Sequence, residues 1–216
     1  FKMIILFSAK IKESFQKDLQ ASFPNQHFIF WTSHENFLKN IPKAHVVVTY
    51  GEDLDQQKIQ MAENLQWIMV LSAGMERLPF AEIAKRNILV TNVKGIHKIP
   101  MSEYAISMLL QYYRQEKLLI RHEAEAIWDK SVTMQEISGR HMLIVGTGAI
   151  GQEVARLAKA FRIKTYGVSR SGQPVEYVDE MYTLDTWGDV LPKVDIIISI
   201  LPSTEETRGL YTYRVF

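Results

Sequence analysis

Three glycines stand at a spacing that could hold the phosphates of a dinucleotide. Gly146, Gly148 and Gly151 form a G-x-G-x-x-G pattern that follows the apolar run from Met142 to Val145 and opens a segment of helical period. In a strand–turn–helix unit of this kind, the first glycine allows the tight turn, the second lets a pyrophosphate approach the backbone, and the third lets the helix pack on the strand. The helix N-terminus adds unpaired N–H groups and partial positive charge. The pattern therefore predicts a dinucleotide-binding loop.

Ala149 and Ile150, between the second and third glycines, belong to the same predicted site. A loop that binds nucleoside triphosphates carries Lys and then Ser or Thr directly after its last glycine. Gln152 and Glu153 stand at those positions, so that class of loop is excluded. A tight turn without a ligand is the alternative that the glycines leave open.

The choice of dinucleotide depends on the end of the next apolar run. A site specific for NAD carries Asp or Glu about 20 residues after the glycines, where it accepts hydrogen bonds from the ribose 2′-hydroxyl. Ser169 and Arg170 stand 23 and 24 positions after Gly146. A hydroxyl and a guanidinium can bind a 2′-phosphate that a carboxylate would repel. The sequence favours NADP(H), and NAD(H) is the other cofactor that it allows; Arg170 would then stack on the adenine or point into solvent.

Short apolar runs alternate with segments of helical period along the chain, and these elements must position the loop. Continuous apolar runs separated by helices indicate parallel strands buried on both faces. The predicted strands are Met3 to Phe7, His27 to Trp31, Val46 to Thr49, Trp67 to Leu71, Ile88 to Thr91, His141 to Val145, Ile163 to Val168 and Asp195 to Leu201. The predicted helices include Ile11 to Ala21, Gln56 to Asn64, Phe80 to Arg86 and Ile150 to Phe161. The fold class is therefore α/β, with one compact domain up to about residue 95 and a second series that begins after Gly139.

A longer helical stretch is predicted between the two series, from about Pro100 to Trp128. Proline is tolerated in the first turn of a helix, and Glu103 near that end suits the helix dipole. We interpret the stretch as a domain connector that also presents an apolar face for self-association. A core helix within one domain is the alternative.

The composition argues against several classes of partner and cofactor. The chain has 216 residues, with 25 Lys and Arg against 24 Asp and Glu, and it contains no cysteine. A net charge of +1 without a basic cluster argues against nucleic acid and membrane surfaces as partners. Without cysteine there is no disulfide framework, and no spacing of His, Asp and Glu predicts a metal site. Charged residues interrupt the most apolar stretch, 105–120, so we expect no membrane span and a cytoplasmic location.

Six motifs follow one another in an order that resembles the D-isomer-specific 2-hydroxyacid dehydrogenases. They are Leu71-Ser72-Ala73-Gly74, Val90-Thr91-Asn92-Val93-Lys94-Gly95, Met101-Ser102-Glu103, Trp128, the glycine loop, and Leu201-Pro202-Ser203-Thr204-Glu205-Glu206-Thr207-Arg208-Gly209. The resemblance covers nearly the whole chain. Within the family it is closest to the glyoxylate/hydroxypyruvate reductase branch, and only the Ser169–Arg170 cofactor signal supports that placement.

This resemblance implies a two-domain fold and an enzymatic function. Residues 1–97 would form a flavodoxin-like substrate domain, residues 98–135 a helical connector and dimerisation arm, and residues 136–216 the first half of a Rossmann coenzyme-binding domain. The implied protein is a homodimer joined through the helical region 100–128. Its reaction is hydride transfer between NADP(H), or NAD(H), and the 2-carbon of a small 2-hydroxy or 2-oxo acid.

The same resemblance implies roles for individual residues. The backbone N–H groups of Ser72, Ala73 and Gly74 would bind the substrate carboxylate, whereas the residues alone are compatible with an ordinary strand-to-helix turn. For the cofactor, Leu201 and Pro202 would line the adenosine pocket, Thr207 would form a hydrogen bond, and Met101 would approach the nicotinamide.

The catalytic Arg, Glu and His of the family would lie beyond Phe216, so we expect no catalytic residue in this sequence. His97, His122 and His141 have no carboxylate at a spacing that suggests a replacement. We expect that the 216 residues belong to a longer reductase and are inactive by themselves. Two alternatives are a dinucleotide-sensing binding or co-regulator protein of the same fold, and a natural fragment that acts only as an interaction module.

Overall fold

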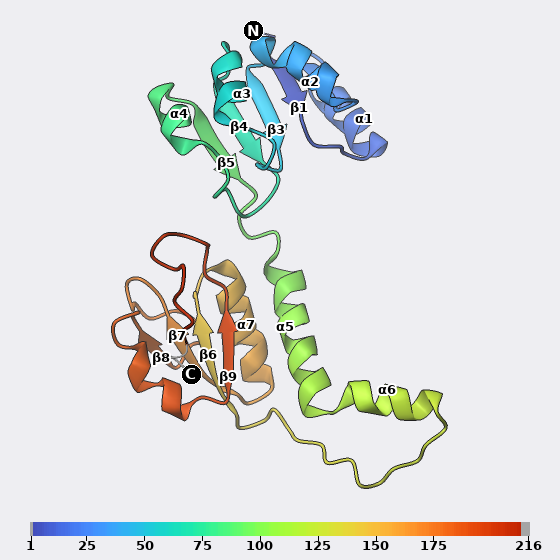
Figure 1. The fold of residues 1–216 in the computed structure, drawn as a ribbon, viewed down its shortest axis with the longest axis vertical. Coiled ribbons are helices and arrows are strands. Elements are labelled where there is room, and N and C mark those ends of the chain that lie inside the picture. Colours follow the sequence, from blue (N-terminus) through green and yellow to red (C-terminus); the bar gives the residue numbers. More distant parts are fainter. Residues whose placement is uncertain (1, 213–216) are drawn as a thin grey trace. The chain divides into compact units, whose positions relative to one another are not determined.

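The computed structural model describes residues 2–212, which form two compact α/β units. The first unit is Phe1–Lys94 and the second is Gly95–Phe216. Each unit is built on one parallel sheet (Figure 1).

The first unit has five parallel strands in the order β2-β1-β3-β4-β5. The strands are β1 (Ile4–Phe7), β2 (His27–Ile29), β3 (Val46–Thr49), β4 (Trp67–Val70) and β5 (Leu89–Asn92). The helices between them are α1 (Glu13–Ser22), α2 (His34–Asn40), the short 3₁₀ helix Ile41–Lys43, α3 (Gln56–Met61) and α4 (Phe80–Lys85). The strand order 2-1-3-4-5 is that of a flavodoxin-like sheet, so the fold predicted for this part of the chain is confirmed.

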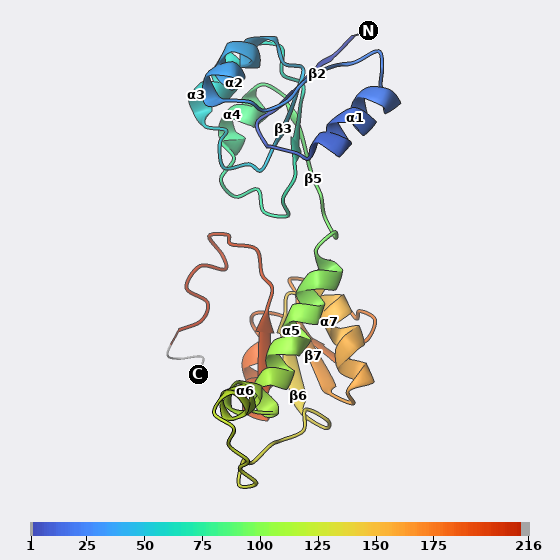
Figure 2. The ribbon, with the colours of Figure 1, turned by 90° about the vertical axis from the view of Figure 1, so that its right-hand side faces the viewer.

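Helices cover both faces of this first sheet (Figure 2). One core lies under α2, α3 and α4, which contribute Phe37, Ile59 and Ile83. The other lies under α1, where Leu19 packs against a cluster that contains Val46. All four residues of the central strand β3 are buried, and this burial explains why its sequence is a continuous apolar run.

The second unit has four parallel strands in the order β8-β7-β6-β9. They are β6 (His141–Val145), β7 (Lys164–Val168), β8 (Glu180–Tyr182) and β9 (Ile196–Ser199). Helix α7 (Ala149–Ala160) connects β6 to β7, and two 3₁₀ helices, Trp187–Asp189 and Leu191–Lys193, precede β9. Counted within this unit, the order is 3-2-1-4, as in the first four strands of a Rossmann sheet.

The helical stretch expected at 100–128 consists of two helices, α5 (Lys98–Tyr113) and α6 (Glu116–Ala124). Gln115 between them has a φ of 56°, in the left-handed region, and this conformation interrupts the helical backbone. Residues 125–140 contain no helix. The expected helical stretch is therefore divided in two and ends at Ala124, short of Trp128. Hydrophobic periodicity does not detect a single residue in left-handed backbone.

The second sheet lies between two layers. On one face, Tyr113 of α5 and Val154 of α7 pack with Met142 in a common core. On the other face, Trp187 packs with Leu143. Helix α5 thus contributes to the core of the second unit.

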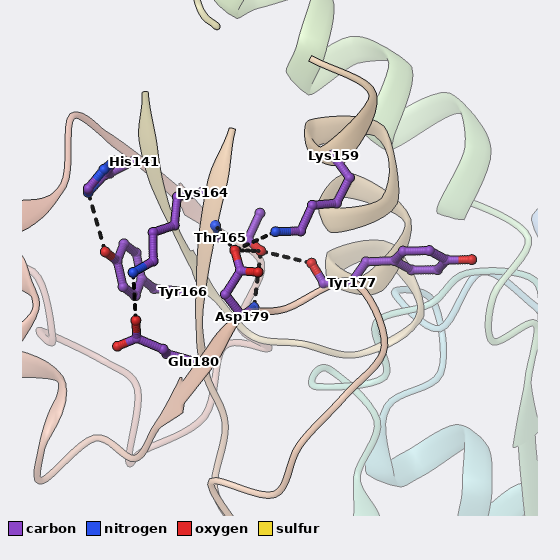
Figure 3. A network of polar contacts seen from close by, with 8 residues as sticks. All are labelled: His141, Lys159, Lys164, Thr165, Tyr166, Tyr177, Asp179 and Glu180. Carbon is purple, nitrogen blue, oxygen red and sulfur yellow. Dashed lines mark hydrogen bonds and ion pairs between the residues drawn. The ribbon is translucent and has the colours of Figure 1, made fainter. Parts of the chain in front are cut away.

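A network of polar contacts holds the edge strand β8 beside β7 and α7 (Figure 3). The carboxylate of Asp179 accepts a hydrogen bond from the backbone N–H of Thr165 at 2.8 Å and forms an ion pair with Lys159 of α7. Beside this pair, the ammonium of Lys164, the first residue of β7, lies 2.7 Å from the carboxylate of Glu180, the first residue of β8. Burial acts to raise the pKa of Asp179, but hydrogen bonds from Lys159 and Thr165 outweigh it and hold that pKa below its ordinary value.

The substitution Asp179→Asn is expected to lower the free energy of unfolding at neutral pH by about 0.5–1 kcal/mol, a value that allows for solvent screening of a partly exposed pair. Because the folded-state pKa is lowered, the contribution is present above the unfolded pKa of about 3.9 and is lost as the pH falls through the folded pKa. Urea unfolding at several pH values should therefore show that acidification lowers the free energy of unfolding less in the variant than in the wild type.

Asp185→Asn is the matched control for this experiment, since it removes an exposed carboxylate from the loop after β8. In this control, acidification should lower the free energy of unfolding as much as it does in the wild type. If acidification lowered the free energy of unfolding equally in the wild type and in Asp179→Asn, the stabilising role given to the Asp179 carboxylate would be contradicted.

Candidate functional site

The turn between β6 and α7 requires glycine at its first position. Gly146 has a φ of 103°, a conformation that side chains rarely allow. Its backbone N–H donates to the carbonyl of Val168 at 2.9 Å, so it extends the pairing of β6 with β7. A Cβ atom placed on Gly146 would lie 2.7 Å from the carbonyl oxygen of Ile200, in the chain that leaves β9. Gly146 is therefore required both by its backbone conformation and by the close approach of a neighbouring segment.

The other two glycines differ in what the fold requires of them. A Cβ atom on Gly151 would lie 2.2 Å from the carbonyl oxygen of Gly146, so this glycine is needed for α7 to pack against the turn. Gly148 has a φ of −74°, which any residue adopts, and a Cβ atom there would meet nothing within 4 Å. A purely structural turn explains Gly146 and Gly151 but leaves Gly148 without a reason. Open space at Gly148 fits a ligand that approaches the backbone at that point.

The N-terminus of α7 is free of acidic side chains that would occupy its positive end. Gly148 is the N-cap and supplies no side-chain hydrogen bond, and the first turn of α7 contains no acidic residue. Ala149 and Ile150 form the start of that turn and are partly exposed. The backbone N–H groups and the helix dipole at this end can accordingly bind a phosphate. The residues present fit the pyrophosphate of a dinucleotide.

Ser169 and Arg170 follow β7, next to the glycine loop, because β6 and β7 are adjacent parallel strands whose carboxyl ends lie at the same edge. The Ser169 hydroxyl accepts a hydrogen bond from the backbone N–H of Gly172 at 3.1 Å, which closes a turn. The Arg170 side chain is 89% exposed, and its guanidinium lies 3.9 Å from the Glu206 carboxylate. Arg170 thus stands at the correct sheet edge with most of its surface in solvent.

The chain that leaves β9 lies on the other side of the glycine loop. Leu201 packs against the core that contains Leu143, and Pro202 is exposed. The Thr207 hydroxyl donates to the Pro202 carbonyl at 2.6 Å and accepts from the backbone N–H of Thr204 at 2.9 Å. Its proton is therefore used within the loop, and a hydrogen bond from Thr207 to a cofactor would require the hydroxyl to rotate.

Met101 lies on the first turn of α5, which packs on α7 within the second unit. The residue is 45% exposed. Its predicted approach to a nicotinamide stays a prediction.

In the first unit, the loop 72–74 follows β4, and its last two carbonyl groups accept hydrogen bonds. The Ser72 hydroxyl donates to the Gly74 carbonyl at 2.7 Å, and the side-chain amide of Asn92, at the end of β5, donates to the Ala73 carbonyl at 2.8 Å. Among the described residues, no acceptor pairs with the backbone N–H of Ala73 or Gly74, and both residues are exposed. Two such N–H groups in one turn can bind a carboxylate.

A pocket of about 250 Å³ adjoins this loop, lined by residues 50–52, Ser72 and residues 74–77. It lies at the carboxyl ends of β3 and β4, the edge at which ligands bind in parallel sheets. Its charged residues are Glu52, Glu76 and Arg77, which belong to none of the sites predicted from the sequence. The signal that could have found them is their position after two predicted strands that are neighbours in the sheet.

The described residues contain no cluster of three or more His, Cys, Asp and Glu side chains that could hold a metal ion. His141 lies at the amino end of β6, away from the glycine loop, and its Nδ1 is 3.3 Å from the Tyr166 hydroxyl. No helix in the described part of the chain has the length and apolarity that crossing a bilayer requires.

A family model and several known proteins match this chain. The model described as D-isomer specific 2-hydroxyacid dehydrogenase, NAD binding domain, matches residues 106–216. A solved structure of a D-isomer specific 2-hydroxyacid dehydrogenase family protein from Aeromonas salmonicida subsp. salmonicida A449 is 30% identical, with a TM-score of 0.85, over 97% of this chain and 67% of that one.

Two curated relatives carry more specific names. The chain is 29% identical to a hydroxypyruvate reductase of Thermotoga maritima, over 82% of this chain and 57% of that protein. It is 28% identical to a D-3-phosphoglycerate dehydrogenase of Archaeoglobus fulgidus, over 82% of this chain and 34% of that protein. The chain thus spans between about a third and just over half the length of these relatives.

Substitutions at two of the glycines should separate a structural turn from a ligand loop. Gly146→Ala should lower the free energy of unfolding by about 1–3 kcal/mol, because it adds both an unfavourable φ and a backbone clash. Gly148→Ala should cost less than about 1 kcal/mol, the usual difference between these residues at an N-cap, yet weaken dinucleotide binding at least about tenfold. Urea unfolding and fluorescence titration with NADPH measure the two effects. Full NADPH affinity in Gly148→Ala would show that the open space is not a ligand site.

Proposed function

Because the chain belongs to the D-isomer specific 2-hydroxyacid dehydrogenase family, we propose that it functions in an NAD(P)-dependent oxidoreductase. The reaction is hydride transfer between the cofactor and the 2-carbon of a small 2-hydroxy or 2-oxo acid. The observation that carries this proposal is the open space at Gly148, between two glycines that the fold itself requires. A bound dinucleotide explains why residue 148 is glycine, whereas the geometry of the turn alone does not.

Each unit contributes one binding loop to the proposed reaction. The bound nicotinamide supplies the hydride-carrying carbon. The first turn of α7, from Ala149, receives the pyrophosphate at its N–H groups, and Gly148 leaves the space for it. The N–H groups of Ala73 and Gly74 hold the substrate carboxylate and so orient the 2-carbon. No described residue is assigned to proton transfer, which we attribute to the family's Arg, Glu and His outside these residues.

NADP(H) is the proposed cofactor, and Arg170 is the reason. It follows β7, where the ribose 2′ position of a dinucleotide lies in this fold, and no carboxylate stands at residue 169 or 170. Its exposed guanidinium can form charge-assisted hydrogen bonds with a 2′-phosphate.

The region of α6 and the segment after it is the proposed dimerisation surface. Several apolar side chains stand exposed there, above all Ile120 at 63% and Trp128 at 87%. A pocket of about 500 Å³ lies between α6 and the segment, lined in part by Leu119, Ile127 and Met134. Exposed apolar patches of this kind favour association, here with a second copy of the chain. Sedimentation that finds only monomers of the full-length protein at micromolar concentration would contradict this proposal.

The proposed activity is tested by adding glyoxylate or hydroxypyruvate and NADPH to the intact gene product. We expect the NADPH absorbance to fall with the 2-oxo acid and to be stable without it. The 216 residues alone should bind NADPH without turnover. If the intact protein binds NADPH tightly but leaves its absorbance unchanged at saturating substrate, the enzymatic proposal is wrong.

Arg170→Ala should weaken NADP(H) binding by about 1–3 kcal/mol, the usual loss for a hydrogen bond to a charged group, and should hardly affect NAD(H). Titrations of both cofactors against wild type and variant measure the difference. Arg121→Ala removes an exposed guanidinium from α6 and is the matched control, with no expected effect on either cofactor. Equal weakening of NADPH and NADH in Arg170→Ala would count against a role in 2′-phosphate binding.

A further inference from the structure

We propose that the pocket beside loop 72–74 selects against 2-oxo acids that carry a second negative charge, and that Glu52 and Glu76 are the residues responsible. The inference rests on the proposed function and names its substrate class, namely small 2-oxo monocarboxylates with an uncharged side chain. The two curated relatives differ in this property, since one is named for a phosphorylated acid and the other for an uncharged hydroxy group.

The pocket is placed to receive the substrate side chain. Ser72 and Gly74 belong both to the loop whose N–H groups can hold a carboxylate and to the lining of the pocket. Because Ser72 and Gly74 line this volume of about 250 Å³, we infer that the rest of a 2-oxo acid bound at that loop enters it. Everything that lines the pocket comes from the first unit, from the segments that follow β3 and β4.

Carboxylates outnumber cations in this lining. Arg77 is the one cation among the described lining residues, and its guanidinium lies 3.3 Å from the Glu52 carboxylate. The charges of this exposed pair largely cancel for a ligand nearby. The Glu76 carboxylate remains, and in the described part of the chain it forms no ion pair. Asp53, whose carboxylate accepts from the Thr49 hydroxyl, adds a further negative charge at the end of β3.

The position of Glu76 makes its charge effective. Its two carboxylate oxygens lie 2.6 Å and 3.0 Å from the point at which a Cβ atom on Gly74 would stand. The absence of a side chain at Gly74 thus lets the carboxylate fold over the loop. A substrate's own carboxylate is compensated there by the N–H groups of Ala73 and Gly74. No cation in the described lining is left to balance a second anionic group, because Arg77 already faces Glu52. That second group also meets Coulomb repulsion from Glu76.

The test compares two substrates of similar size, hydroxypyruvate with one negative charge and oxaloacetate with two, using the intact gene product and NADPH. The measured quantity is the ratio of kcat/KM for oxaloacetate to kcat/KM for hydroxypyruvate. We expect the wild type to favour hydroxypyruvate by about tenfold or more, as for charges separated by a few ångströms in a partly solvated pocket.

Three variants should move this ratio in directions set by their charge. Glu76→Gln should raise the ratio by about three- to tenfold, and Glu52→Gln should raise it as well because it also frees Arg77. Arg77→Gln should lower the ratio. Glu63→Gln is the matched control and should leave the ratio unchanged. It removes an exposed carboxylate from the segment before β4, at the amino ends of the strands.

A measurement on the wild type keeps the test independent of how the variants fold. Raising the ionic strength should narrow the discrimination, because salt screens exposed charges. A ratio near one in the wild type, a ratio insensitive to salt, or one that neither glutamate variant moves would overturn this inference and leave the proposed function standing. If hydroxypyruvate is not reduced and calorimetry detects no binding of oxamate with NADPH present, the proposed function falls and this inference falls with it.

Discussion

The close backbone packing around the β6–α7 turn is the constraint on which the arrangement of the second unit depends. A side chain at Gly146 would collide with the carbonyl of Ile200, and one at Gly151 would collide with the carbonyl of Gly146. The first strand, its helix and the chain that leaves β9 can meet only because these atoms are absent. In the order 3-2-1-4, β6 and β9 flank the point at which the direction of strand addition reverses, where parallel sheets leave a crevice for a ligand. The packing that closes the fold therefore also shapes the site.

Parallel sheets gather the chemistry of both units at the carboxyl ends of their strands. In the second unit the glycine loop, the turn at Ser169 and the segment from Leu201 follow β6, β7 and β9, which are neighbours in the sheet. In the first unit the hydrogen bond from Asn92 to Ala73 joins the end of β5 to the loop after β4. At the other end of the second sheet, Asp179 and its partners hold the edge strand in place. One end of that sheet thus carries the proposed ligand site, and the other carries the polar contacts of its edge strand.

Apolar patterning predicted the buried strands well and the marginal elements poorly. Strand β6 was predicted with its observed bounds because all but its first residue are buried and apolar. Strand β8 was missed because it has three residues, lies at a sheet edge and begins with Glu180. Helix α1 was predicted from its helical period, yet Phe15 on that helix is 55% exposed. Such elements depend on contacts with distant residues, which a local period does not contain. The break at Gln115 belongs to the same class, because a single backbone angle leaves no trace in hydrophobicity.

The sequence by itself determined the α/β class, the family and the position of the glycine loop, because glycine spacing and continuous apolar runs are local consequences of strand–turn–helix geometry. Only the tertiary structure decided which glycines the fold needs and which it leaves open, since that depends on atoms of Ile200 and Gly146 brought close by folding. It also decided which charges share a pocket. Glu52 and Glu76 are far apart in sequence but line one volume, because β3 and β4 pair in register. Charge at a site is a property of neighbours in space, and those neighbours exist only once the sheet has formed.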